Sequence, residues 1–98
     1  MRYEENIIGD RLTLEESQYH NEYIAKWREL TVATVEKLAT GQQYAIIEWG
    51  ADQESTSTSY YVNNLEAAWR HIKNCCRGDF EEELRGMEGQ IQHRGFRR

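Results

Sequence analysis

The residues best suited to metal binding or catalysis are His71 and Cys75, which stand four positions apart. On a helix this spacing places both side chains on one face, where they could bind a single metal ion. A metal site needs more ligands, and the sequence cannot place the remaining candidates, His20, His93 and Cys76, beside this pair. The simpler interpretation is that the cysteines are small hydrophobic residues at the edge of a core and that His71 is a half-exposed helical residue. We therefore predict no metal and no cofactor.

The same pair could act as a cysteine nucleophile and its base, with a carboxylate such as Glu66 orienting the imidazole. Nothing else in the chain supports catalysis. The sequence contains neither a Gly-x-Ser-x-Gly nucleophile elbow nor a glycine-rich phosphate loop. We expect that the protein is not an enzyme.

Two charged runs near the C-terminus suggest binding rather than chemistry. Glu81, Glu82 and Glu83 are consecutive, so their carboxylates diverge around a helix and cannot form a paired acid–base site. Such a run is typical of a solvated face near a helix N-terminus. The segment 94–98, Arg-Gly-Phe-Arg-Arg, combines cations with an aromatic ring, as single-strand nucleic-acid binders do, but it is short and has one ring.

Charge is distributed unevenly along the chain. Residues 1–89 contain all seventeen Asp and Glu and nine of the twelve Lys and Arg, a net charge of −8, and Arg94, Arg97 and Arg98 add three positive charges. DNA affinity depends largely on the neutralisation of phosphates, so a body this acidic should repel nucleic acid. It suits a protein partner with a basic surface, although solubility alone explains the same charge.

Size and composition limit the class of protein. A chain of 98 residues forms one domain. Cys75 and Cys76 are adjacent and point about 100° apart on a helix, which leaves no disulfide framework. No apolar run approaches the roughly 20 residues of a membrane span, and no charged-then-apolar leader opens the chain. We expect a soluble cytoplasmic protein.

The segment Thr13–Ala39 carries a helical pattern. A capping box, Thr13-x-x-Glu16, precedes apolar residues at steps of three and four. The β-branched run Thr31–Val35 weakens helical propensity, but packing usually overrides propensity. The spacing therefore predicts a long N-terminal helix with one apolar stripe: Tyr23, Trp27, Leu30, Thr34 and Leu38.

The second half of the chain predicts a hairpin and a helix. Gln43–Trp49 and Thr56–Val62 alternate in polarity around a polar turn, which is typical of an antiparallel β-hairpin. Asn63 or Asn64 then caps a helix that ends at Arg77-Gly78, and a further helix is allowed from Asp79. The expected buried stripe of the capped helix is Leu65, Ala68, Trp69, Ile72 and Cys76.

The predicted fold class is thus α+β. A long N-terminal helix, an antiparallel hairpin and one or two C-terminal helices packed on the sheet form a compact domain over residues 1–91, and residues 92–98 form a basic tail. Met1–Asp10 either adds a third short strand or forms an ordered arm. Two chains could also join sheet edges in a homodimer.

For function we expect a small, non-enzymatic acidic protein that binds and blocks a larger protein. Its size and charge are those of phage or mobile-element inhibitors such as anti-CRISPR proteins, although the residues identify no family. The alternatives are a nucleic-acid-binding accessory domain that uses the basic tail, and a toxin-immunity protein. The expected partner has a basic surface, as in a nucleic-acid-handling complex. The predicted partner-binding residues are Glu15, Glu16, Glu22, Tyr61, Glu81, Glu82, Glu83, Arg94, Arg97 and Arg98.

Overall fold

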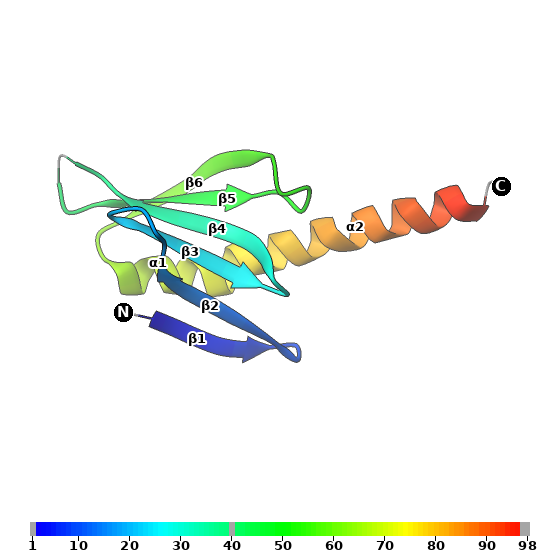
Figure 1. Cartoon of the computed structure of the whole chain (residues 1–98), viewed down its shortest axis with the longest axis horizontal. Coiled ribbons are helices and arrows are strands. Elements are labelled where there is room, and N and C mark those ends of the chain that lie inside the picture. The colour runs from blue at the N-terminus through cyan, green and yellow to red at the C-terminus, as the bar shows by residue number, and fades with distance from the viewer. Residues whose placement is uncertain (1, 40, 97–98) are drawn as a thin grey trace.

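A six-stranded antiparallel sheet dominates the computed structural model, which describes residues 2–39 and 41–96, with side chains described as far as Met87. Each strand pairs with the next along the chain, in the order β1-β2-β3-β4-β5-β6. One C-terminal helical segment lies across a single face of the sheet (Figure 1). The strands are β1 (Arg2–Ile7), β2 (Asp10–Glu16), β3 (Glu22–Trp27), β4 (Leu30–Lys37), β5 (Tyr44–Trp49) and β6 (Thr56–Val62). The helical segment consists of α1 (Leu65–His71), a π-helical turn η1 (Ile72–Cys76) and α2 (Arg77–Phe96).

The predicted N-terminal helix over Thr13–Ala39 is wrong, because this segment lies in β2, β3, β4 and their connections. The apolar residues at steps of three and four happen to fit a helix, but the β-branched residues of β4 favour a strand. Buried residues on these strands follow the two-residue period of a sheet with one covered face. The alternating core positions are Leu12 and Leu14, Ala25 and Trp27, and Ala33 and Val35.

Two of the connections between these strands are tight turns with positive φ angles. Between β3 and β4, Arg28 and Glu29 have φ angles of 57° and 63°. Positive φ at both central residues characterises the type I′ hairpin turn, which usually carries Asn-Gly or Asp-Gly. Neither residue of this turn is Asn, Asp or Gly, so the sequence contains no turn signal at this point. The β1–β2 turn is similar, with Ile8 at 52° and Gly9 at 80°.

The C-terminal half follows its sequence pattern more closely. The predicted hairpin is confirmed, because β5 and β6 pair antiparallel. Asn64 caps α1 as expected, its Oδ1 accepting a hydrogen bond from the Ala67 amide at 2.7 Å. The predicted helix end at Arg77-Gly78 is wrong, since the chain continues there directly into α2. Met1–Asp10, left open by the sequence, contains the edge strand β1.

The core lies between the sheet and the helical segment. The predicted helical stripe is buried, and Phe80 of α2 extends it. Tyr3 of β1 stacks on Trp69 with ring centroids 5.6 Å apart, and Lys73 Nζ lies 3.2 Å from the Glu5 carboxylate, so the helix also holds the edge strand. Within the part of the chain that the structure describes, no helix covers the opposite face of the sheet (Figure 1).

Candidate functional site

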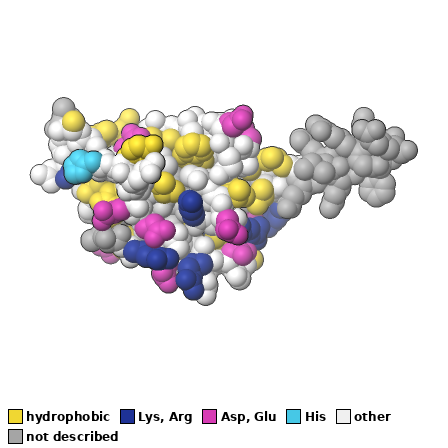
Figure 2. All heavy atoms as spheres, viewed as in Figure 1, with side chains coloured by type: hydrophobic (Ala, Val, Ile, Leu, Met, Phe, Trp, Pro, Cys, Tyr) yellow, Lys and Arg dark blue, Asp and Glu magenta, His cyan; other side chains and the backbone are white. Residues whose placement is uncertain are grey.

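The helix-free face of the sheet carries a mostly apolar hollow of about 430 Å³. Side chains that alternate with the core residues project from this face, because successive residues of a strand point to opposite sides. Figure 2 shows hydrophobic side chains reaching the surface over the strands, with acidic and basic side chains around them. The residues that line the hollow are Tyr19, Glu22, Ile24, Thr31, Thr34, Glu36, Ile47, Trp49 and Thr56.

Trp49 distinguishes this face from the core. Trp27 and Trp69 are buried on the helix side, whereas Trp49 is half-buried on the helix-free side. Its Nε1 donates a hydrogen bond to Thr34 Oγ1 at 3.3 Å, which holds the indole against β4. Alternation assigns Trp49 to a face of its strand, but it does not say which face a helix covers.

Two unpaired glutamates lie beside this hollow. Glu22 and Glu36 are directly opposite each other in the register of β3 and β4. Neither carboxylate makes an ion pair or a hydrogen bond with any residue that the structure describes. Like charges in such a cross-strand pair destabilise a sheet. The pair is therefore an electrostatic cost in the free protein, and a cation placed between the carboxylates would relieve it.

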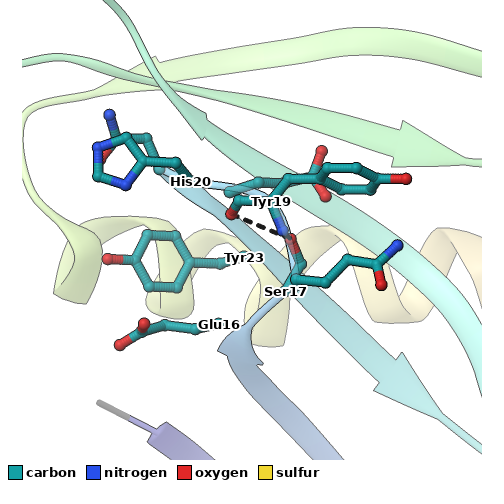
Figure 3. Close-up of a pocket in the computed structure, with 8 residues that line it drawn as sticks. Glu16, Ser17, Tyr19, His20 and Tyr23 are labelled. Carbon is teal, nitrogen blue, oxygen red and sulfur yellow. Dashed lines mark hydrogen bonds between the residues drawn. The ribbon is translucent and has the colours of Figure 1, made fainter.

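A second hollow, of about 440 Å³, lies at the loop between β2 and β3 and is lined by residues 16–23. Ser17 holds this loop, its Oγ accepting a hydrogen bond from the Tyr19 amide at 2.9 Å. Figure 3 shows the Tyr19 ring directed away from His20 and Tyr23. Burial, with a smaller contribution from Tyr44, raises the pKa of Tyr23, so its hydroxyl stays protonated. Tyr19 is 64% exposed and borders both hollows.

The predicted N-terminal contact residues are partly brought together. Glu16 and Glu22 both line the loop hollow, at the end of β2 and the start of β3. Glu15 lies on β2 and pairs with Arg2 at 3.6 Å, so its charge is partly compensated. Tyr61 is 54% exposed on β6. The three glutamates lie on strands and not on the predicted N-terminal helix, whereas Tyr61 lies on the strand predicted for it.

The acidic triplet of α2 lies on the other side of the sheet and has three different environments. Glu81 is buried and binds Arg77 at 2.8 Å and Arg85 at 2.9 Å. Glu83 accepts a hydrogen bond from the Ala51 amide at 2.8 Å and so ties α2 to the β5–β6 turn. Glu82 is exposed. The remaining predicted contacts, the side chain of Arg94 and both Arg97 and Arg98, lie outside the described residues.

Of the two cysteines, Cys76 is the one that the structure groups with His71 and Glu48. Cys75 is exposed, whereas Cys76 is buried, and the ligand atoms of Glu48, His71 and Cys76 lie within 4.8 Å of one another. Burial, with Glu48 adding, raises the pKa of the Cys76 thiol to about 12. A neutral thiol is a poor nucleophile, so this geometry gives no support to cysteine catalysis.

Comparison of the chain with protein-family models, with curated proteins and with solved structures finds no match. Among the described residues, no helix combines the length and apolarity needed to cross a membrane.

Proposed function

We propose that the protein is a small, non-enzymatic binding protein that attaches to a larger protein through the helix-free face of its sheet and blocks the surface that it covers. The observation that carries this proposal is that Glu22 and Glu36, opposite each other on β3 and β4 and without ion-pair partners among the described residues, lie beside the apolar hollow of Trp49. Aromatic side chains are common anchors of protein interfaces, and complementary charge selects the partner. Hydrophobic contact and unsatisfied charge thus occur at one place.

The chemistry of the hollow indicates the kind of surface that fits it. Ile24, Ile47 and Trp49 would accept an aliphatic or aromatic side chain of the partner. Glu22 and Glu36 would accept hydrogen bonds from a Lys or Arg next to that side chain. Tyr19, largely exposed at the rim, would add contact area at low entropic cost because its ring has few rotatable bonds.

The net charge of residues 1–89 also favours a partner with a basic surface. Residues 1–89 carry nine basic against seventeen acidic residues, so a basic partner would be attracted over a distance of about 10 Å at moderate salt. A nucleic-acid-handling protein offers such a surface. The phage or mobile-element inhibitor type, with anti-CRISPR proteins as the example, is our proposal for the class, and its support is the size and charge of the chain.

The test compares variants of the tagged full-length protein in affinity capture from extracts of its host. We expect the partner captured by the wild type to be lost with Trp49→Ala and with the double variant Glu22→Lys/Glu36→Lys. The double variant Glu54→Lys/Glu82→Lys is the matched control, because it makes the same charge change at two exposed residues that do not line the hollow, and it should retain the partner. Circular dichroism of each variant confirms that the sheet is intact.

Salt dependence separates this mechanism from others. Raising the salt concentration from 0.1 to 1 M shortens the Debye length from about 10 to about 3 Å, and we expect at least a tenfold loss of affinity. A partner retained equally by wild type and face variants would contradict the proposal. Recovery of RNA or DNA, lost on deletion of residues 92–98, would instead favour the accessory-domain alternative.

A further inference from the structure

Two irregularities of the backbone meet at one point between sheet and helix. The first is η1, where the Arg77 amide donates to the Ile72 carbonyl five residues earlier instead of four. The second is a bulge in β6: Ile46 pairs with Tyr60 and Ile47 with Thr58, which leaves Ser59 without a partner in the register. Both kinds of irregularity disrupt regular hydrogen bonding and are frequent at functional sites.

The π-helical turn changes which side chains share a face. Residues five apart lie about 140° apart around an α-helix, so His71 and Cys76 would diverge in regular helix. Hydrogen bonding from residue i to i+5 brings them back to the same side. Both then face β5, where Glu48 projects toward the helix. One ligand atom from each of these three residues lies within 4.8 Å of the other two.

The strand bulge orients the imidazole. Ser59 Oγ lies 3.2 Å from His71 Nε2, at hydrogen-bond distance, and the Tyr60 ring stacks on the imidazole with centroids 4.9 Å apart. A hydrogen bond at one ring nitrogen is the usual support of a metal-binding histidine, and here the stacked Tyr60 ring also restricts the imidazole. Glu48 is half-buried, and its carboxylate has no ion pair or hydrogen bond among the described residues.

We propose that Glu48, His71 and Cys76 bind a single Zn²⁺ ion. Thiolate, imidazole and carboxylate together match zinc, whereas calcium and magnesium prefer oxygen ligands alone. Ligand atoms on one tetrahedral zinc ion stand roughly 3.5 Å apart, so shifts of about 1 Å close the site. The Cys76 thiol releases its proton to solvent as the sulfur–zinc bond forms. Water takes the fourth position.

Glu48 borders a surface hollow, and coordination of an ion by it has a consequence for the fold. Glu48 also lines a hollow of about 200 Å³ that opens beside Ser57 and Glu83. Coordination joins β5 to the helical segment at η1, the place where the helix departs from α geometry. Zinc should therefore stabilise the packing of the helix on the sheet, and this role is independent of the helix-free face proposed for partner binding.

The test uses Co²⁺ as a spectroscopic substitute for zinc on the full-length protein. We expect a thiolate-to-cobalt charge-transfer band in the near ultraviolet and the intense visible bands of tetrahedral Co²⁺, and Zn²⁺ should displace both. Cys76→Ala should abolish the charge-transfer band, while the neighbouring Cys75→Ala, its matched control, should retain it. At a hundredfold excess of Zn²⁺ over its Kd, the Tm should rise by roughly 10–20 °C.

If Cys76→Ala does not fold, variants of the other two ligands still test the proposal, because His71 and Glu48 are half-exposed and their replacement should be tolerated. His71→Gln and Glu48→Gln should each weaken Co²⁺ binding at least tenfold. The proposal is overturned if the wild type shows no tetrahedral spectrum at millimolar Co²⁺. It is equally overturned if Cys75→Ala, and not Cys76→Ala, removes the charge-transfer band, or if His71→Gln and Glu48→Gln bind the ion as the wild type does.

Discussion

Glu81 shows that the residues of one charged run can contribute to the fold in different ways. It is buried under Arg77 and Arg85 and accepts a hydrogen bond from each. The Arg77 guanidinium also lies 5.0 Å from the ring centre of buried Trp27, so the carboxylate positions a cation over the core. The hydrogen bond from Arg77, with Arg85 adding, holds the pKa of Glu81 below its ordinary value of 4.5.

This lowered pKa predicts a loss of stability in acid. A carboxylate with a lower pKa in the folded than in the unfolded protein stabilises the fold above pH 4.5, and the contribution disappears as the pH falls through the folded pKa. We expect Glu81→Gln to lower the urea midpoint at pH 7 and to reduce its fall between pH 6 and pH 3. Glu82→Gln should change neither quantity. An unchanged pH dependence in Glu81→Gln would contradict this assignment.

Among the elements, the hairpin turns determine the topology of the sheet and store some strain. Ile8 adopts a φ of 52° in the β1–β2 turn, although a β-branched residue strongly disfavours the left-handed region. In the β3–β4 turn, the side chain of Arg28 compensates, since it binds Asp10 at 2.8 Å and covers the Trp27 ring at 4.0 Å. Ile8 is 63% exposed and gains little burial in return.

Relief of that strain should stabilise the protein. Ile8→Asn places the preferred Asn-Gly pair in the turn, and we expect the free energy of unfolding to rise by about 1 kcal/mol. Ile8→Ala keeps an unfavourable residue at positive φ and serves as the control. The measurement is equilibrium urea denaturation monitored by circular dichroism. If Ile8→Asn is no more stable than Ile8→Ala, the turn is not strained.

At the scale of the whole molecule, one face of the sheet forms the core and the other face is the one proposed to bind the partner. The helix side contains the buried cluster around Trp27, whereas the helix-free side carries the hollow of Trp49 and the opposed Glu22 and Glu36. A surface shaped only by stability would place opposite charges at such a cross-strand pair. Binding and stability should therefore respond in opposite directions to a change at this pair.

Glu36→Lys tests this opposition. The new lysine would face Glu22 across the strands, and we expect a gain of about 0.5 kcal/mol in the free energy of unfolding together with weaker partner binding. Glu54→Lys makes the same charge change in the exposed β5–β6 turn and should leave partner binding unchanged. Urea denaturation and affinity capture measure the two effects. If Glu36→Lys lowers the free energy of unfolding or leaves partner binding unchanged, the proposed opposition between stability and binding at this pair is wrong.

Local signals of the sequence determined the hairpin, the Asn64 cap and the buried stripe of the helix, because each of these depends on neighbouring residues. The strands between Thr13 and Ala39 could not be recognised, since their register depends on pairing between distant segments and the Arg28–Glu29 turn carries no glycine or asparagine. Only tertiary structure decided which sheet face the helix covers, and with it the exposure of Trp49. Only tertiary structure brought Glu48 to His71 and Cys76, because the π-helical turn that aligns the last two has no sequence signature.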